Sequence, residues 1–267
     1  MTPDVATMAV LLAGFGAALL WFTRRARAGR SQYVRPVAGL AALNEAIGRA
    51  TEMGRPILYV PGIADISDIQ TIASMAILSE VATVAAKYDT RTIVPCCMPL
   101  VFPIADEVVK AGYANAGRPD AYQSDDVRFL SDDQFAYTAG VTGIMLREKP
   151  ATNIFLGAFW AESLILAETG FEAGAIQIAG TANVSQLPFF VAACDYTLIG
   201  EEIYAASAYI SGDPKLLGSL KASDLAKVVF AAIIVVGAIV ANVPALGELF
   251  ESAFGITFRE LFVPGDG

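Results

Sequence analysis

The chain has 267 residues, of which 55% are hydrophobic, and it carries 27 acidic against 18 basic residues, a formal net charge of -9. Its mean hydropathy of +0.54 is too high for a purely soluble protein, so we expect part of its apolar surface to face lipid. The acidic excess argues against a nucleic-acid partner, because binding phosphates requires clustered Lys and Arg side chains.

The first predicted element is a membrane anchor over residues 1–23. No charged residue occurs in residues 6–22, and a helix of that length would just cross a hydrocarbon core of about 30 Å. A cleaved export signal carries its positive charges ahead of the apolar core, whereas here an arginine cluster, from Arg24 to Arg30, follows it. We therefore predict a permanent anchor, with the amino terminus outside and the next segment on the cytoplasmic side, where basic residues are preferentially retained.

Residues 24–226 are predicted to form a cytoplasmic α/β domain. Short β-rich apolar runs alternate with helical segments, which is typical of a Rossmann-like, mostly parallel sheet with helices on both faces. Most of the runs are continuously apolar, as strands buried on both faces should be. The predicted strands are residues 56–60, 91–96, 127–130, 153–158, 175–180 and 195–200. The predicted helices are residues 40–52, 65–88, 100–114, 133–148, 161–169 and 201–210.

A second membrane-spanning helix is predicted over residues 227–246. Its uncharged run, residues 228–243, is preceded by lysines up to Lys227 and followed by Glu248 and Glu251, so the same charge rule returns the chain to the outside. Either apolar run could instead be a buried core helix, since both lie near the lower length limit for a span. Small residues such as Gly14 and Gly16 would let neighbouring membrane helices approach closely.

Residues 247–267 are predicted to form a short amphipathic tail. Four phenylalanines recur every fourth residue and would lie on one broad stripe of a helix: Phe250, Phe254, Phe258 and Phe262. An interfacial helix on the outer membrane face and a partner-binding helix are both compatible with this pattern. The predicted protein therefore crosses the plasma (inner) membrane twice, with both termini outside.

Candidate ligand-binding residues lie at the carboxyl ends of the predicted strands, where open α/β sheets usually bind ligands. They are Gly62, Cys96, Cys97, Gly180, Thr181, Asn183 and Glu201. The stretch IAGTANVSQ could bind an anion at a helix start, but it lacks the lysine of a P-loop and the glycine spacing of a dinucleotide site. The alternative is that these residues form an ordinary turn.

Acidic residues also follow several strands, and their oxygens could converge on a hard cation: Asp132, Asp133, Glu162, Glu201 and Glu202. Acidic residues are also expected at helix starts, where they interact favourably with the helix dipole, so capping is the favoured interpretation. No metal and no cofactor is predicted.

The stretch VPCCMP raises the question of thiol chemistry. Two adjacent cysteines and the distant Cys194 make neither a disulfide framework nor a zinc-type spacing. The pair could form a redox or soft-metal site, but a reactive thiolate would need a nearby positive group or a helix start, and buried structural cysteines are common. Adjacent thiols also cannot bridge each other without strain. The chain has no histidine, which excludes Ser-His-Asp and Cys-His catalysis, and no catalytic residue is predicted.

Two stretches carry a family resemblance: RPILYVPG near the start of the domain and AACDYTLIGEEIYAASAYISGDP near its end. They resemble an uncharacterised family of prokaryotic membrane-anchored α/β proteins, known only as a domain of unknown function. The resemblance covers roughly residues 33–220, and its motifs are not catalytic ones. It implies the architecture without adding a reaction.

Three functional hypotheses follow from these patterns. The first is a membrane-anchored structural or scaffold protein that assembles laterally into a homo-oligomer or with other membrane proteins, in contact with membrane lipid. The second is a ligand-binding or sensory domain that uses the crevice at the strand ends. The third is a thiol-dependent enzyme at Cys96 or Cys97. A channel or transporter is disfavoured, because neither span carries an intramembrane charge.

Overall fold

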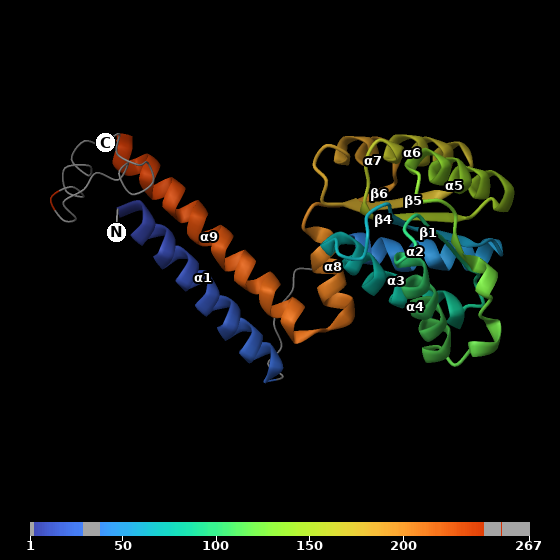
Figure 1. Cartoon of the computed structure of the whole chain (residues 1–267), viewed down its shortest axis with the longest axis horizontal. Coiled ribbons are helices and arrows are strands. Elements are labelled where there is room, and N and C mark those ends of the chain that lie inside the picture. Colours follow the sequence, from blue (N-terminus) through green and yellow to red (C-terminus); the bar gives the residue numbers. More distant parts are fainter. Residues whose placement is uncertain (1–2, 29–37, 243–251, 253–267) are drawn as a thin grey trace. The chain divides into compact units, whose positions relative to one another are not determined.

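The computed structural model describes residues 3–28, 38–242 and 252. These residues belong to two compact units, one that contains helices α1 and α9 and one that runs from helix α2 to helix α8. The elements of both units are labelled in Figure 1.

The centre of the larger unit is a six-stranded, fully parallel sheet with the order β3-β2-β1-β4-β5-β6. The strands are β1 (Ile57–Gly62), β2 (Thr92–Cys96), β3 (Val127–Phe129), β4 (Thr152–Ala158), β5 (Ile176–Thr181) and β6 (Tyr196–Ile199). The predicted strands and the mostly parallel, Rossmann-like sheet are confirmed. This is the doubly wound order, in which the direction of winding reverses between β1 and β4.

Helices cover both faces of the sheet, as the sequence predicts (Figure 1). One face carries α2 (Ala38–Met53), α3 (Ile69–Lys87), α4 (Val101–Asn115) and α8 (Glu202–Ser211). The other carries α5 (Gln134–Glu148), α6 (Glu162–Glu172) and α7 (Leu187–Ala193). Two short 3-10 turns, η1 (Pro119–Ala121) and η2 (Ser124–Asp126), lie between α4 and β3. Helix α7 is an element that the sequence analysis missed.

Each face of the sheet has its own hydrophobic core. Beneath α2, α3, α4 and α8, the buried Tyr59 donates a hydrogen bond of 2.6 Å to the carbonyl of Ser74. Beneath α5, α6 and α7, Phe155, Phe159 and Phe190 pack ring against ring. Successive side chains of a strand therefore enter the two cores in turn. This explains why the strand sequences are continuously apolar.

Acidic side chains begin two of the helices. Asp68 accepts a hydrogen bond from the backbone N–H of Gln70 at 2.7 Å and caps α3. Asp133 accepts from the N–H groups of Phe135 and Ala136, at 3.1 and 2.8 Å, and caps α5. The capping interpretation of Asp133 is therefore confirmed, because its carboxylate satisfies amides that have no partner within the helix.

The smaller unit is a pair of long helices, α1 (Pro3–Arg27) and α9 (Pro214–Asn242), which run antiparallel and side by side (Figure 1). The two helices come close together at Gly218 of α9, where a Cβ atom would lie 2.7 Å from the Cα atom of Thr23. By length and composition, both helices are apolar enough to cross a membrane. Their apolar windows are 0% and 6% buried inside the structure.

Helix α3 is the third helix that is long and apolar enough for a span, but 61% of its apolar window is buried against the sheet and its neighbours. Its composition therefore reflects a core position in the α/β unit.

Helix α9 begins at Pro214, so the predicted boundary between residues 226 and 227 falls inside one continuous helix. Proline at the first helical position favours this earlier start. Apart from Ser252, the predicted tail of residues 247–267 lies outside the described residues.

A tight contact at Gly170 of α6 provides a test of the packing on one face of the sheet. An added Cβ atom there would lie 2.5 Å from the side-chain nitrogen of Asn153 and would also overlap the side-chain oxygen of Gln177. Both amides are buried. We expect Gly170→Ala to lower the free energy of unfolding by about 1–3 kcal/mol, because these side chains must move. Urea unfolding of the full chain in mild detergent measures the change.

Gly48→Ala in α2 is the matched control for this substitution. A Cβ atom at Gly48 meets no atom within 4 Å, so the methyl group should only raise helix propensity, stabilising by up to about 1 kcal/mol. Equal effects of the two substitutions would contradict the steric explanation.

Candidate functional site

The candidate site is the carboxyl edge of the sheet, which we define as the segments that follow the six strands: residues 61–72, 97–104, 130–136, 159–165, 182–189 and 199–204. In doubly wound sheets this edge holds the ligand, at the point where the winding reverses. Here that point lies between the ends of β1 and β4. All of the sequence-predicted ligand residues lie at the ends of strands that reach this edge.

The ends of β1 and β4 are locked together by two glycines. The N–H of Ile63 donates to the carbonyl of Ala158 at 3.0 Å, and the pairing shifts register between Val60 and Gly62. Gly62 has φ +88°, and a Cβ atom there would lie 2.5 Å from the Ala158 carbonyl oxygen. Gly157 has φ +148° and would place its Cβ atom onto the carbonyl of Pro61. Gly62 therefore has a structural reason for being glycine, namely the close approach of two strands.

Gln70, in the first turn of α3, binds the end of β5 and the segment that follows it. Its buried side-chain oxygen accepts from the N–H of Ala182 at 2.6 Å and from the hydroxyl of Thr181 at 3.2 Å. Its nitrogen donates to the side-chain oxygen of Asn183 at 3.4 Å, and the Asn183 nitrogen donates to the carbonyl of Phe159 at 2.7 Å. Thr181 and Asn183 thus meet at the predicted place, but their hydrogen bonds go to the protein itself.

The start of α3 is also poorly suited to an anion such as a phosphate. The carboxylate of Asp68 occupies the helix start, and that of Asp65 accepts from the N–H of Ile66 at 2.7 Å. These negative charges stand where a dinucleotide-binding sheet would hold a pyrophosphate.

Gly180 and Glu201, two further predicted ligand residues, lie apart from this network. Gly180 is inside β5, where a Cβ atom would come within 2.6 Å of Leu156. The backbone carbonyl of Glu201 accepts from the N–H groups of Tyr204 and Ala205, both at 3.0 Å, at the start of α8. Close packing of neighbouring strands explains the glycine at position 180, and the start of α8 explains the contacts of Glu201.

The two adjacent thiols lie on opposite faces of the sheet. Cys96 belongs to the core beneath α3 and α4, whereas Cys97 belongs to the core beneath α5 and α6. Burial raises the pKa of the Cys96 thiol to about 12 and that of the Cys97 thiol to about 11. Cys194 also has a pKa of about 12, chiefly because of burial. The neutral thiol is favoured at all three positions, which opposes nucleophilic or redox chemistry.

These raised pKa values predict a loss of stability at alkaline pH. An unfolded thiol loses its proton near pH 9, while the folded thiols keep theirs up to a pKa of about 11 or 12, so the folded state binds more protons in that range. Their contribution is complete below pH 9 and is lost as the pH rises through this window. Between pH 9 and the pKa of the folded thiol, we expect each thiol to contribute a decrease in the free energy of unfolding of up to about 1.4 kcal/mol per pH unit.

Thermal unfolding at a series of pH values measures this slope. A variant that combines Cys96→Ala with Cys97→Ala should show a shallower decline than the wild-type chain above pH 9, because two of the titrating groups are gone. Parallel declines in the two proteins would contradict the assignment.

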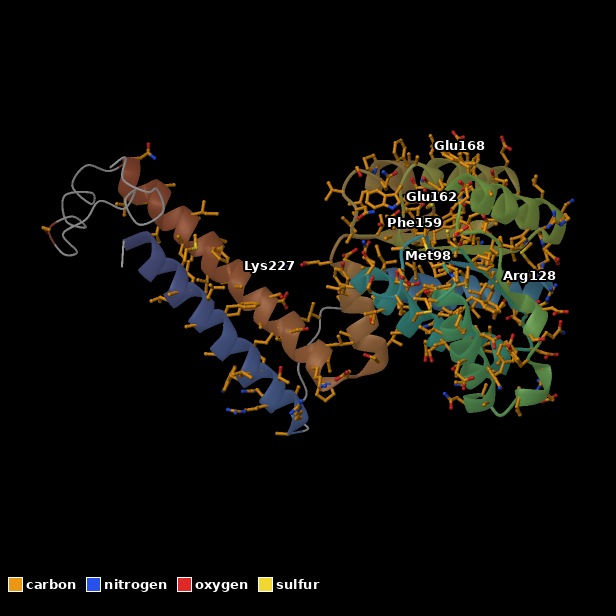
Figure 2. The ribbon with its side chains drawn as sticks, viewed as in Figure 1. Met98, Arg128, Phe159, Glu162, Glu168 and Lys227 are labelled. Atoms are coloured by element: carbon orange, nitrogen blue, oxygen red, sulfur yellow. The ribbon has the colours of Figure 1, made fainter. Side chains whose placement is uncertain are left out.

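A buried carboxylate, Glu162, begins α6 beside the aromatic core (Figure 2). It accepts from the N–H of Trp160 at 2.9 Å and from the side-chain nitrogen of Gln134 at 2.5 Å, which joins α6 to α5. Within the described parts of the chain, no three Cys, Asp or Glu side chains are grouped so that they could hold a metal ion. Glu162 therefore acts as a polar link between two helix starts.

Large apolar side chains are exposed along the carboxyl edge. At least one large apolar side chain follows or ends every strand: Ile69 and Ile72, Leu100 and Ile104, Phe135, Trp160 and Leu164, Val184, and Ile199. Their exposed fractions reach 78% at Val184. Four of the six segments contain acidic residues, and none of the six contains lysine or arginine. The edge therefore exposes both apolar and acidic side chains. Exposed apolar patches rimmed by polar residues mark interaction sites in general.

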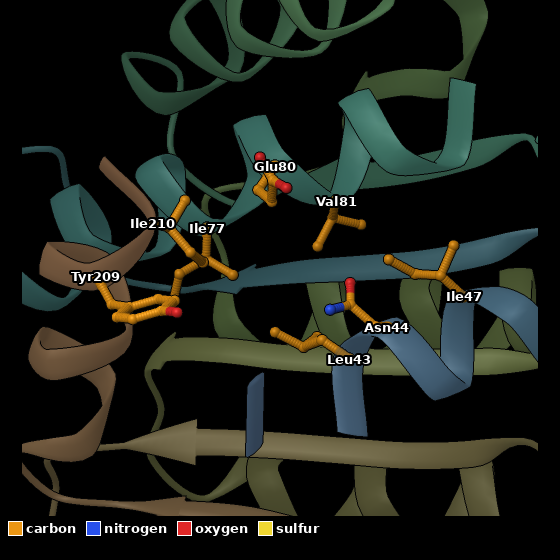
Figure 3. Close-up of a pocket in the computed structure, with 8 residues that line it drawn as sticks. All are labelled: Leu43, Asn44, Ile47, Ile77, Glu80, Val81, Tyr209 and Ile210. Carbon is orange, nitrogen blue, oxygen red and sulfur yellow. The ribbon is translucent and has the colours of Figure 1, made fainter. Parts of the chain in front are cut away.

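Two cavities of the α/β unit lie away from this edge. The first, of about 220 Å³, is a groove between α2, α3 and α8 lined mainly by apolar side chains, with Asn44 and Glu80 as its polar members (Figure 3). The second, of about 280 Å³, lies beside the amino ends of β5 and β6 and contains Arg49 and Asp195. Both are smaller than most small-molecule sites, which have volumes of about 300–1,000 Å³.

Sequence reasoning missed two side chains that shape the edge, Gln70 and Val184. Gln70 is the second residue of a helix that also contains Thr71, Ser74 and Glu80, so its local sequence does not signal its role. The exposure of Trp160 and Val184 depends on where the loops fold, which periodicity does not encode.

Together the sheet order and the two helical layers define a doubly wound α/β protein, joined in one chain to a pair of long apolar helices. The chain belongs to the family described as "Domain of unknown function (DUF6754)", whose model matches residues 3–251 and so includes both units. No curated protein and no solved structure matches the chain. The predicted membership of an uncharacterised family is confirmed.

Proposed function

We propose that this protein is a membrane-anchored scaffold, which assembles laterally through its α/β domain into a homo-oligomer or a larger membrane complex. The observation that carries the proposal is the carboxyl edge: the protein's own hydrogen bonds close the place where a ligand would enter, and exposed apolar side chains surround it. Such a surface is suited to contact with another protein.

The helix pair supports the membrane part of the proposal. The outward surfaces of α1 and α9 are apolar over most of their length and need a cover of lipid or of other helices. Gly14, on α1, has no atom within 4 Å of a built Cβ position, so a neighbouring helix would have access to it.

The charges of the helix pair support an orientation with the α/β domain in the cytoplasm and both termini outside. Arg24, Arg25 and Arg27 occupy the last turn of α1, and the contact between Thr23 and Gly218 places that turn beside the lysine-containing start of α9. Basic residues of both helices therefore gather at one end of the pair, the end that is retained on the cytoplasmic side of the plasma membrane.

The two other functional hypotheses have less support. A ligand-binding or sensory domain would need an open crevice at the strand ends, where Gln70 and Asn183 instead make hydrogen bonds within the protein. A thiol-dependent enzyme would need a thiol that ionises readily, whereas burial holds the pKa of Cys97 near 11.

The scaffold proposal is tested by the mass of the full chain purified in mild detergent. We expect a defined multimer, and Val184→Lys at the carboxyl edge is expected to reduce its mass. Tyr209→Lys, near the end of α8 in the same unit, changes a 60% exposed side chain outside that edge and serves as the control. A monodisperse monomer of the wild-type chain would contradict the proposal.

The orientation has a separate test in intact cells. A membrane-impermeant maleimide should label a cysteine placed at Asp4, in α1, and should leave one placed at the exposed Lys149 of the α/β unit unlabelled until the cells are opened. Labelling of the Lys149→Cys variant from outside would reverse the assignment.

A further inference from the structure

The helix pair of the smaller unit has a strongly basic end. We define this basic end as residues 21–28 of α1 together with residues 212–227, which include the start of α9. Its charged side chains are six basic and two acidic ones: Arg24, Arg25, Arg27, Lys215, Lys221, Lys227, Asp213 and Asp224. The basic end is therefore positively charged, although the whole chain has a formal net charge of -9.

Both acidic side chains of the basic end already have partners next to them in the chain. The carboxylate of Asp213 accepts from the backbone N–H of Lys215 at 2.8 Å, where α9 begins. The carboxylate of Asp224 lies 3.6 Å from the ammonium nitrogen of Lys221, one turn away on the same helix. Among the residues that the structure describes, no ion pair involves an arginine of α1 or the side chain of Lys215.

The close contact between the two helices shows which of their residues are level. A Cβ atom at Gly218 would lie 2.6 Å from the hydroxyl oxygen of Thr23, so these two residues face each other. Because the helices run antiparallel (Figure 1), Lys215 and Arg27 each lie about one turn beyond this contact, in the same direction. The two basic residues are therefore at nearly the same level of the pair.

Arg24, Arg27 and Lys215 also lie on one side of the pair. Successive side chains turn by about 100° around an α-helix, so both arginines leave α1 clockwise from the contact, viewed from the amino end of α1. In that view α9 runs toward the observer, and Lys215 leaves it anticlockwise from the contact. The two rotations bring the three exposed side chains to the same side, whereas Arg25 and Lys221 point away from it.

We infer that Arg24, Arg27 and Lys215 bind the phosphate group of an anionic phospholipid. Two guanidinium groups offer paired donors that match phosphate oxygens, and the lysine adds a compact positive charge. The inference rests on the proposed membrane anchoring and gives the anchored protein a defined lipid partner.

The place of these residues along α1 favours a lipid headgroup over a free anion. The uncharged run of α1 ends at Phe22, so the arginines begin where the phosphate layer of a membrane would begin. Trp21, whose ring centre lies 5.4 Å from the guanidinium carbon of Arg25, is of the type enriched at membrane interfaces. A phospholipid bound here can place its acyl chains along the apolar surface of the pair.

The test uses the full chain, purified in mild detergent and stripped of lipid. It is mixed with dioleoylphosphatidylglycerol, which is anionic, or with dioleoylphosphatidylcholine, which is zwitterionic, and native mass spectrometry counts the bound lipids. We expect the anionic lipid to bind at a concentration about tenfold lower. Equal binding of the two lipids would overturn the inference. Displacement of the anionic lipid by an equal concentration of inorganic phosphate would also overturn it and assign the site to a free anion.

Two double variants separate this site from the general charge of the basic end. The site variant combines Arg24→Gln with Lys215→Gln, and the control combines Arg25→Gln with Lys221→Gln. Each removes one arginine and one lysine, but only the first removes groups from the inferred site. We expect the site variant to lose about tenfold or more in affinity for the anionic lipid, and the control to lose less than about threefold. Equal losses would mean that only net charge matters, and the site would be refuted.

Salt provides a measurement that needs no variant. The anionic lipid should raise the Tm of the wild-type chain, and this rise should shrink between about 0.05 M and about 0.5 M NaCl, because salt screens attraction between exposed charges. A rise that salt leaves unchanged would contradict a phosphate contact.

An alkaline carbonate wash of cell membranes tests the anchoring separately. Release of the chain from the membrane would overturn the anchoring and the lipid site together. Retention of the chain, combined with equal binding of the two lipids, would overturn the lipid site alone.

Discussion

Gly157→Ala is expected to destabilise the α/β unit more than any other methyl addition to a glycine. The residue has φ +148°, which an L side chain rarely adopts, and its new Cβ atom would overlap the backbone of Pro61 in the neighbouring strand. The obstacle is backbone, so no side-chain rotation can relieve the clash, and β1 must move away from β4. We expect a loss of at least about 3 kcal/mol in the free energy of unfolding.

Thermal unfolding of the full chain in mild detergent measures this loss. For a unit of this size we expect the Tm to fall by about 6–12 °C. Gly174→Ala is the matched control: it also has positive φ, at +70°, but no atom lies within 4 Å of its built Cβ position. It should cost about 1 kcal/mol through backbone strain alone. Equal losses at the two sites would refute the strand lock between β1 and β4.

Phe190→Ala is expected to produce the second large loss of stability. The Phe190 ring is fully buried and lies 5.2 Å from the ring centre of Phe159 and 6.0 Å from that of Phe155. Removing it leaves a cavity between α7 and the sheet, for which we expect a cost of about 3–5 kcal/mol. The free energy of unfolding in urea gives the value.

Phe189→Ala provides the comparison on the same helix. Phe189 is 38% exposed, so its removal should leave a smaller cavity and cost about 1 kcal/mol. Similar costs for the two phenylalanines would mean that α7 does not pack on the sheet as described.

The strands were predictable because the sheet is buried on both faces. In β1, β2 and β4 every residue is buried, so each strand is visible in the sequence as an apolar run between polar turns. Helix α7 was not predictable in the same way. It has seven residues, contains Pro188, and begins soon after a strand, so its sequence shows no helical periodicity that can be separated from a loop.

The start of α9 cannot be located from hydropathy, because the helix begins at Pro214, before its apolar run. The polar residues of the segment between Pro214 and Lys227 resemble a linker, yet nothing in that segment breaks a helix once it has begun. The apolar run that follows continues the same helix. The charged residues up to Lys227 therefore mark the beginning of the apolar surface. The helix itself begins earlier, at Pro214.

The candidate site was predictable in its place but not in its chemistry. Topology brings Gly62, at the end of β1, and Thr181 and Asn183, at and after the end of β5, to the same edge of the sheet, with β4 between the two strands. Gln70 of α3 accepts hydrogen bonds from Thr181 and Ala182 there, and this long-range contact leaves no trace in local sequence. The adjacency of Cys96 and Cys97 is misleading, since successive residues of a strand point to opposite faces.

The central claim is that the carboxyl edge is a contact surface of a membrane-anchored assembly. Its most direct test is the subunit number of the chain extracted with its native lipids, counted by single-particle imaging or native mass spectrometry. The account predicts particles that contain several copies, and particles of one copy when Trp160 and Phe135 at that edge are replaced. Single copies throughout, or undiminished particles after the replacements, would contradict it.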